Sequence, residues 1–164
     1  MSHKITDPAS VLTPPGTTAD TMLRLDNQLC FALYSASLAM TRLYQPLLGA
    51  LGITYPQYLA MLVLWEQDGL SVSELGERLL LDSGTLTPLL KRIETSGLVT
   101  RQRDAHDERR VNIRLSPAGR EMKARAASIP GCILNAAQCP VPKLVALTRQ
   151  VQALRQRLVQ GGPA

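Results

Sequence analysis

The stretch from residue 71 to residue 115 restricts the fold of this chain more than any other part of the sequence. It begins with Ser71-Val-Ser-Glu74, which matches the Ser-x-x-Glu capping box that starts a helix. A tight connection leads to residues 83–95, where apolar residues recur at i, i+3, i+4 and i+7. Segments 98–103 and 111–115 then alternate like two strands joined by a polar tip at 104–110. This order of helix, helix and hairpin is typical of a winged helix-turn-helix.

Further helices are predicted before this unit. Residues 1–20 are rich in proline and lack periodicity, so we expect a flexible arm. A stripe of apolar residues predicts a helix at 25–43, which Pro46 and Gly49 interrupt. A mostly apolar helix is expected at 54–67.

Two more helices are predicted after the hairpin. Ser116 and Pro117 supply an N-cap and a first residue for a helix that runs towards residue 135, with a kink or break at Pro130-Gly131. A last helix is expected at about 143–159. The predicted fold class is therefore mainly α with a small β-hairpin wing.

The positive charge of the chain is concentrated in one segment. Residues 91–125 hold ten basic and five acidic residues, so this segment carries the whole net charge of +5. A cationic excess confined to one stretch is typical of a protein that binds a polyanion. Within the predicted helix-turn-helix, it favours double-stranded DNA as the partner.

Composition excludes several other classes of protein. The chain is 45% hydrophobic, which excludes wholesale disorder, and its apolar runs are too short for a membrane helix. Its polar, proline-rich start does not resemble a signal peptide, so a cytoplasmic protein without a membrane partner is expected. Three cysteines are too few for a disulfide scaffold, and no CxxC pair, histidine cluster or phosphate-binding glycine loop indicates a metal or a cofactor.

Polar residues of the second helix and of the hairpin are the candidates for DNA contact. In a winged helix-turn-helix the second helix enters the major groove, while basic residues of a wing suit phosphates or a narrow minor groove. The alternative is that they form solvated faces of an ordinary helix and hairpin. The candidates are Ser83, Thr85, Thr87, Lys91, Arg92, Arg101, Arg103, Arg109 and Arg110.

Residues 71–121 resemble the MarR family of dimeric transcriptional regulators. The resemblance is most specific in the wing, DAHDERR, and in the segment that follows the second strand, LSPAGRE, and it extends over about residues 24–160. It implies a homodimer that binds a near-palindromic operator. The expected organisation is a single domain at 21–164, with the winged helix-turn-helix at about 54–115 and dimerisation helices at about 24–48 and 117–160.

Cys30 is the candidate for a reactive thiol. If Asp26 or Asn27 caps the first helix, the amide dipoles at its start favour a thiolate at Cys30. A single cysteine is more often buried and inert, and nearby tyrosines can simply fill a core. Tyr34 is one turn from Cys30, whereas Tyr44 is 14 residues away and can reach it only across a dimer interface or by a sharp fold-back.

The segment around Cys30 resembles the OhrR branch of the family, the organic hydroperoxide sensors. The similar text is LDNQLCFALYSASLAMTRLYQPLLGALGITYPQYLAMLVLWE. This resemblance implies that Cys30 is the peroxide-reacting thiolate. It also implies that Tyr44 and Tyr55 donate hydrogen bonds to that sulfur from the partner subunit, with Tyr34 nearby.

Cys132 and Cys139 are the candidates for a resolving cysteine. They are seven residues apart, which would place them on one helical face, and Cys139 is slightly preferred. In two-cysteine members of the branch the resolving cysteine falls where Asn135 stands here, so the assignment departs from the pattern. A mixed disulfide with a small thiol is the alternative.

The expected function is therefore a repressor that releases its operator when an organic hydroperoxide oxidises Cys30, and not an enzyme. Two alternatives remain at this point. One is a MarR-type regulator that responds to a phenolic ligand, with incidental cysteines. The other is a thiol peroxidase that uses Cys30 catalytically, which the winged helix and the basic segment disfavour.

Overall fold

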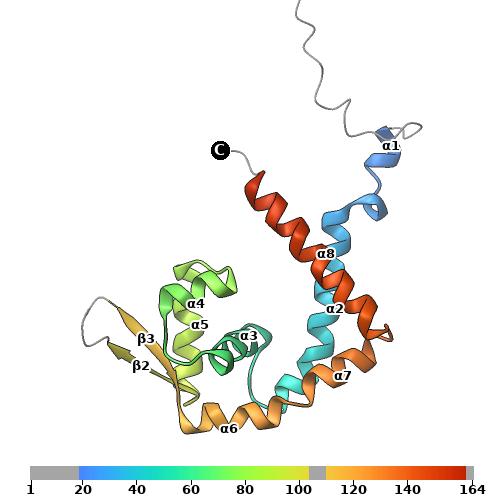
Figure 1. The fold of residues 1–164 in the computed structure, drawn as a ribbon. Helices are drawn as coiled ribbons and strands as arrows, with labels where there is room; N and C mark the ends of the chain where they lie inside the picture. The colour runs from blue at the N-terminus through green and yellow to red at the C-terminus, as the bar shows by residue number, and fades with distance from the viewer. Residues whose placement is uncertain (1–18, 104–109, 162–164) are drawn as a thin grey trace, which may run out of the picture. The chain divides into compact units, whose positions relative to one another are not determined.

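The computed structural model describes residues 19–103 and 110–161, so the arm expected at 1–20 and the tip of the hairpin lie almost wholly outside it. The chain divides into two units, Met1–Thr41 and Arg42–Ala164. Figure 1 shows the elements along the chain. They are α1 (Ala19–Met22), the 3-10 turn η2 (Leu25–Asn27), α2 (Leu29–Gly49), α3 (Tyr55–Glu66), β1 (Leu70–Ser71), α4 (Val72–Leu79), α5 (Ser83–Thr95), β2 (Val99–Arg103), β3 (Val111–Leu115), α6 (Pro117–Ala126), α7 (Ile129–Ala136) and α8 (Val141–Gln160).

Helix α2 starts later and runs further than the sequence predicts. The residues before Leu29 form the 3-10 turn, and Pro46 lies inside the helix. The prediction that Pro46 interrupts this helix is wrong. Proline removes one backbone donor, but here it does so close to the helix end. The next turn is held by Leu48, which is only 1% exposed and belongs to the hydrophobic core.

Helices α4 and α5 confirm the predicted helix-turn-helix, and their ends are set by side-chain caps. Ser71 Oγ accepts a hydrogen bond from the Glu74 N–H at 3.2 Å, while the Glu74 carboxylate accepts one from the Ser71 N–H at 2.8 Å. Helix α4 ends at Leu79, and the following C-cap residue, Leu80, has a φ of 57°, in the left-handed region. Helix α5 begins after Asp82, whose carboxylate accepts from the Thr85 N–H at 2.9 Å. These caps satisfy amides that have no partner within the helix.

The wing is a three-stranded antiparallel sheet in the order β1-β3-β2. The predicted pairing of β2 with β3 is confirmed, with Arg101 opposite Ile113. Strand β1 adds an edge that the sequence does not reveal, since it is two residues long. It pairs Leu70 with Ile113 and Ser71 with Asn112.

The core joins the helix-turn-helix to the sheet. From α5 the side chains of Leu86, Leu90 and Ile93 are at most 1% exposed, and they pack in one cluster with residues of α3, α4 and the sheet. The apolar periodicity read from the sequence therefore marks the buried face of α5. Burial of these side chains is the main source of stability for such a small unit.

The break in the helix after the wing lies earlier than expected. Helix α6 ends at Ala126 and α7 begins at Ile129, so the break precedes Pro130. The prediction of a break is correct, but its place is not. Pro130 occupies the first turn of α7, where a missing backbone donor costs nothing. Pro142 likewise lies in the first turn of α8, which begins at Val141.

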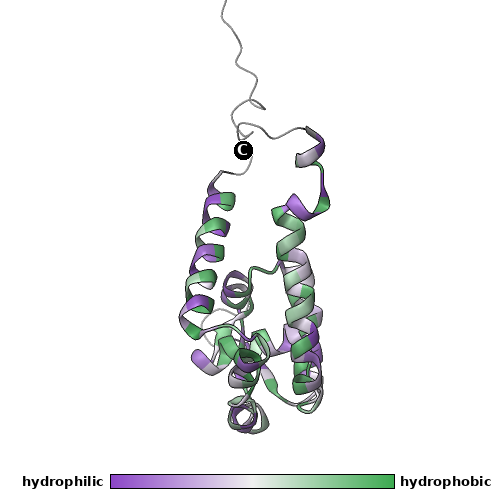
Figure 2. Ribbon diagram, turned by 90° about the vertical axis from the view of Figure 1, so that its right-hand side faces the viewer, coloured by the Kyte–Doolittle hydropathy of each residue, from purple (hydrophilic) through white to green (hydrophobic). Residues whose placement is uncertain are grey.

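Long helices outside the winged helix-turn-helix leave apolar side chains uncovered. Figure 2 shows hydrophobic residues along much of α2. The exposed apolar residues include Leu29, Phe31, Leu33, Leu38, Met40 and Leu43 on α2, and Val141, Val145, Leu147, Val151 and Leu158 on α8. Apolar surface of this extent is typical of an interaction face. Within the described ranges, no helix is long and apolar enough to cross a membrane.

Candidate nucleic-acid interface and sulfur site

The exposed side of α5 carries the candidates for reading DNA. Its core residues point into the reading unit, which we define as residues 54–115, and most of the remaining positions are open to solvent. Thr85 is partly engaged, because its hydroxyl donates to Asp82 Oδ2 at 2.9 Å. The Thr85 N–H and hydroxyl together lower the pKa of Asp82. The five candidates on this helix are exposed: Ser83, Thr85, Thr87, Lys91 and Arg92.

The arginines of the wing are not equivalent. Arg103 is exposed and has no ion pair among the described residues. Arg101 is half-buried and forms an ion pair with Glu94 of α5, and Arg110 forms one with Glu74 of α4. Arg109 lies outside the described residues. Their predicted contacts with DNA stay predictions.

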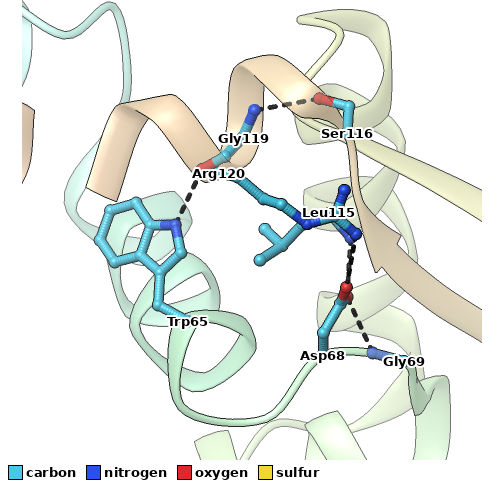
Figure 3. A network of polar contacts seen from close by, with 7 residues as sticks. All are labelled: Trp65, Asp68, Gly69, Leu115, Ser116, Gly119 and Arg120. Atoms are coloured by element: carbon cyan, nitrogen blue, oxygen red, sulfur yellow. Dashed lines mark hydrogen bonds and ion pairs between the residues drawn. The ribbon is translucent and has the colours of Figure 1, made fainter. Parts of the chain in front are cut away.

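The base of the wing is fixed by a polar network (Figure 3). Asp68, in the turn after α3, accepts hydrogen bonds from the Leu115 N–H at 2.8 Å and from Arg120 at 3.0 Å. Burial opposes ionisation of Asp68, but these bonds and one from the Gly69 N–H outweigh it and lower its pKa. An ionised carboxylate therefore ties the end of α3 to the end of β3 and the start of α6.

Helix α6 approaches the wing at Gly119. The Trp65 indole N–H donates to the Gly119 carbonyl at 2.9 Å, and the Gly119 N–H donates to Ser116 Oγ at 3.0 Å. A Cβ at position 119 would lie 2.1 Å from the Leu98 carbonyl oxygen. Sequence reasoning missed these residues, although an isolated glycine within a predicted helix is a sign of close packing.

Cys30 is a free, exposed thiol in the first turn of α2. The helix begins at Leu29, so Asp26 and Asn27 lie in the preceding 3-10 turn and neither is the cap that the sequence suggests. The Asn27 side chain instead donates to the Thr21 carbonyl at 2.6 Å. Tyr34, one turn further along α2, is 61% exposed. The single chain leaves the Cys30 thiol open to solvent, and its role as a reactive thiol stays a prediction.

Tyr44 and Tyr55 lie together in an aromatic cluster. Their ring centroids are 4.8 Å apart, and Tyr58 lies 5.8 Å from Tyr44 and 6.2 Å from Trp65. Burial, followed by the neighbouring Tyr55 and Tyr58, raises the pKa of Tyr44. Its phenol is therefore neutral at physiological pH and able to donate a hydrogen bond. Sequence reasoning paired Tyr44 with Tyr55 by resemblance only, and it missed Tyr58.

The two later cysteines do not share a helix. Cys132 lies in α7 and is exposed, whereas Cys139 is half-buried and follows the end of that helix. The expectation that both are on one helical face is therefore wrong, because the chain leaves the helix after Ala136 and Gln138 takes a φ of 47°. Both thiols are free.

Comparison with known proteins identifies relatives of this arrangement. The family described as "Transcriptional regulator SarA/Rot" matches residues 42–126. The organic hydroperoxide resistance transcriptional regulator of Bacillus subtilis is 57% identical over 113 residues, which are 69% of this chain and 77% of that protein. The HTH-type transcriptional regulator TtmR of Methylorubrum extorquens is 49% identical over 134 residues, which are 82% of this chain and 69% of that protein.

Solved structures of AbfR of Staphylococcus epidermidis have the same fold. Reduced AbfR bound to DNA has a TM-score of 0.72 and 33% identity, covering 87% of this chain and 99% of AbfR. The disulfide form of AbfR has a TM-score of 0.58 and 35% identity, covering 86% and 94%. The predicted winged helix-turn-helix is confirmed, and the expectation of a regulator that is not an enzyme is confirmed as well. The chain therefore belongs to the MarR and SarA family of winged helix-turn-helix, DNA-binding transcriptional regulators, in the redox-sensing OhrR branch.

Proposed function

We propose that this chain is a cytoplasmic, homodimeric repressor that leaves a near-palindromic operator in double-stranded DNA when an organic hydroperoxide oxidises Cys30. The observation that carries the proposal is a free, exposed Cys30 in the first turn of a long helix. The amide dipoles of a helix start favour a thiolate, and the thiolate is the nucleophile that attacks peroxides. The name of the Bacillus relative supports an organic hydroperoxide as the signal.

The first chemical step consumes one peroxide for each thiolate. The Cys30 sulfur attacks the terminal oxygen of the hydroperoxide and the O–O bond breaks. The sulfur becomes a sulfenic acid, and the organic fragment leaves as an alkoxide that takes a proton to become an alcohol. Condensation of the sulfenic acid with a second thiol then forms a disulfide and releases water.

Tyr44 and Tyr55 of the partner subunit are proposed to donate hydrogen bonds to the thiolate before this step, with Tyr34 nearby. The raised pKa of Tyr44 supports this role, because only a protonated phenol can donate. We expect Tyr44→Phe to slow oxidation of Cys30 by cumene hydroperoxide. Tyr58→Phe is the matched control, since Tyr58 belongs to the same cluster but is not proposed to contact sulfur.

A homodimer is supported by the uncovered apolar side chains of α2 and α8. Two-fold symmetry would place the two copies of α5 on half-sites about one helical turn of DNA apart. Size-exclusion chromatography with light scattering tests the dimer directly. A monomer at micromolar concentration would contradict it.

Cys132 and Cys139 are both proposed as candidates to resolve the sulfenic acid. Each is free, and Cys132 is the more exposed of the two. Non-reducing electrophoresis after peroxide treatment separates the cases, because a disulfide between subunits migrates as a dimer. Loss of that band in Cys132→Ser or in Cys139→Ser identifies the partner. A monomer band in the native chain whose intact mass has gained one added small thiol would indicate a mixed disulfide with that thiol.

The central test measures release of DNA. A duplex selected by the reduced protein from a random-sequence library serves as operator, and binding is followed by fluorescence anisotropy with and without cumene hydroperoxide. We expect the native protein to release this duplex on oxidation and Cys30→Ser to keep it. Release by the oxidised Cys30→Ser variant would refute the sensing role of Cys30.

A second candidate is regulation by a phenolic ligand, with the cysteines incidental. An apolar pocket of about 240 Å³, lined by residues of α3, α6 and α7 that include Tyr58, Trp65 and Lys123, favours it. Release of the selected duplex by a phenolic acid such as salicylate under full reduction would support this candidate. Absence of release under those conditions excludes that ligand as the signal.

A further inference from the structure

Arg101 of strand β2 is directed at helix α5. Its Nε lies 3.1 Å from Glu94 Oε2, and the two groups form an ion pair without the alignment of a hydrogen bond. Its Nη2 donates a hydrogen bond to the Thr87 carbonyl at 3.3 Å. The Nε atom is buried. The guanidinium of Arg101 therefore contacts α5 at two points, one turn and three turns into the helix.

Arg110 makes the corresponding contact from the other side of the hairpin. It immediately precedes β3, and its Nη2 donates to Glu74 Oε1 at 2.9 Å. The other carboxylate oxygen of Glu74 accepts from the Ser71 hydroxyl and N–H at the start of α4. Hydrogen bonds from Ser71 and then from Arg110 lower the pKa of Glu74 to about 2, so the carboxylate is ionised at neutral pH.

These two contacts connect each side of the hairpin to a different helix of the reading unit. Arg101 joins β2 to α5, while Arg110 joins the start of β3 to α4. Exposed ion pairs add little to stability, so their consequence is geometric. They fix the direction in which β2 and the start of β3 leave the helix-turn-helix, and hence the placement of Arg103 at the end of β2.

We propose that Arg101 and Arg110 are positioning residues that hold the wing at the angle required for DNA binding, and that they do not themselves neutralise phosphates. The proposal rests on DNA binding by the reading unit and is independent of redox sensing. It differs from the expectation based on charge alone, which counts every arginine of the wing as a phosphate contact.

The salt dependence of binding distinguishes the two roles. Each phosphate contact contributes about −0.9 to the slope of log K against log salt, so loss of one contact makes that slope less steep by about 0.9. We expect Arg101→Gln and Arg110→Gln to weaken binding of the selected duplex up to about fivefold, the factor equivalent to an ion pair at the upper end of the exposed range, with the slope unchanged. Lys91→Gln is the control. If exposed Lys91 of α5 contacts a phosphate, its replacement must make the salt slope less steep.

Removal of the acidic partners provides a test of opposite sign. Glu94→Gln and Glu74→Gln remove negative charge close to a polyanion, which by itself strengthens binding. If the arginines act through these acids, both variants bind more weakly instead. The double variant Glu94→Gln/Arg101→Gln then binds no more weakly than either single variant.

Arg101→Lys supplies a variant that keeps the charge and disturbs the fold least. A lysine can replace an arginine at a phosphate but cannot contact Glu94 and the Thr87 carbonyl with one planar group. We expect it to bind as weakly as Arg101→Gln, with an unchanged thermal melting curve by circular dichroism. Any one of three results would overturn the proposal: native affinity in Arg101→Lys, tighter binding by Glu94→Gln, or a salt slope that is less steep by about 0.9 in Arg101→Gln.

Discussion

Substitution of Gly119 by alanine tests the packing of α6 against the wing. The added Cβ would lie 2.1 Å from the Leu98 carbonyl oxygen, so the backbone at Leu98 and the backbone of α6 must move apart by roughly 1 Å. Displacement of packed groups costs about 1–3 kcal/mol. It also breaks two hydrogen bonds worth about 1 kcal/mol each, from Trp65 to Gly119 and from the Ser116 N–H to Leu98. The better helix propensity of alanine offsets about 1 kcal/mol. The expected net loss is about 2–4 kcal/mol in the free energy of unfolding.

Urea denaturation at one fixed protein concentration measures this loss. Trp65 is the only tryptophan in the chain, and its indole donates to the Gly119 carbonyl, so its fluorescence reports on the altered contact. Circular dichroism at the same urea concentrations reports on the helices. The two probes should give coincident transitions if the reading unit unfolds as one.

Gly131→Ala is the matched control. Gly131 also lies in a helix, but a Cβ there would have no neighbour within 4 Å. We expect this variant to be unchanged or more stable by up to about 1 kcal/mol, from helix propensity alone. Equal urea midpoints for Gly119→Ala and Gly131→Ala would refute the close approach of α6 to Leu98.

Three further predictions concern the reading unit. The pKa values of Asp68 and Glu74 are lowered in the folded protein, so both carboxylates stabilise the folded state at a pH above their unfolded pKa. This stabilisation is lost as the pH falls through the folded pKa. For Glu74 the loss takes place between pH 4.5 and about pH 2. Melting temperatures between pH 5 and pH 2 should therefore fall more steeply in the native chain than in Glu74→Gln, and parallel curves would contradict this. Asp82→Ala removes the cap of α5 and should cost about 0.5–2 kcal/mol in urea denaturation, with Asp82→Asn as the variant that keeps most of it. Leu90→Ala leaves a cavity at a fully buried position and should cost about 2–5 kcal/mol, whereas a loss below 1 kcal/mol would mean that this part of the core can collapse.

The reading unit could be predicted from sequence because its signals are local. Ser71 and Glu74 are three residues apart, and Leu86, Leu90 and Ile93 repeat with the period of a helix. Local signals of this kind specify where a helix begins and which side it buries. Caps and buried residues were accordingly found at the positions expected.

Contacts between residues distant in the chain could not be predicted in the same way. The Arg110–Glu74 pair joins positions 36 residues apart, and the carbonyl that excludes a Cβ at Gly119 belongs to Leu98. Charge counting assigned both Arg101 and Arg110 to an interface, because composition does not reveal an acidic neighbour in space. Strand β1 escaped notice for a related reason, since two residues cannot show alternation.

The Cys30 site could be predicted only in part. Periodicity placed Cys30 near the start of a helix, and the structure leaves its thiol exposed. Residue patterns could not indicate that Tyr58 joins Tyr44 and Tyr55, because the three rings come from two helices. Assignment of Cys132 and Cys139 to one helical face failed, since the left-handed Gln138 ends the helical path between them.

Ser71 has two structural roles at once, and this limits how an operator-binding protein of this type can change. Its backbone pairs with Asn112 in the wing, while its side chain caps α4. Any shift of the wing edge therefore also shifts the first turn of the helix-turn-helix. A substitution that moves this strand edge must therefore be accommodated by α4 as well, so Ser71 should tolerate less change than a residue that serves only one of the two elements.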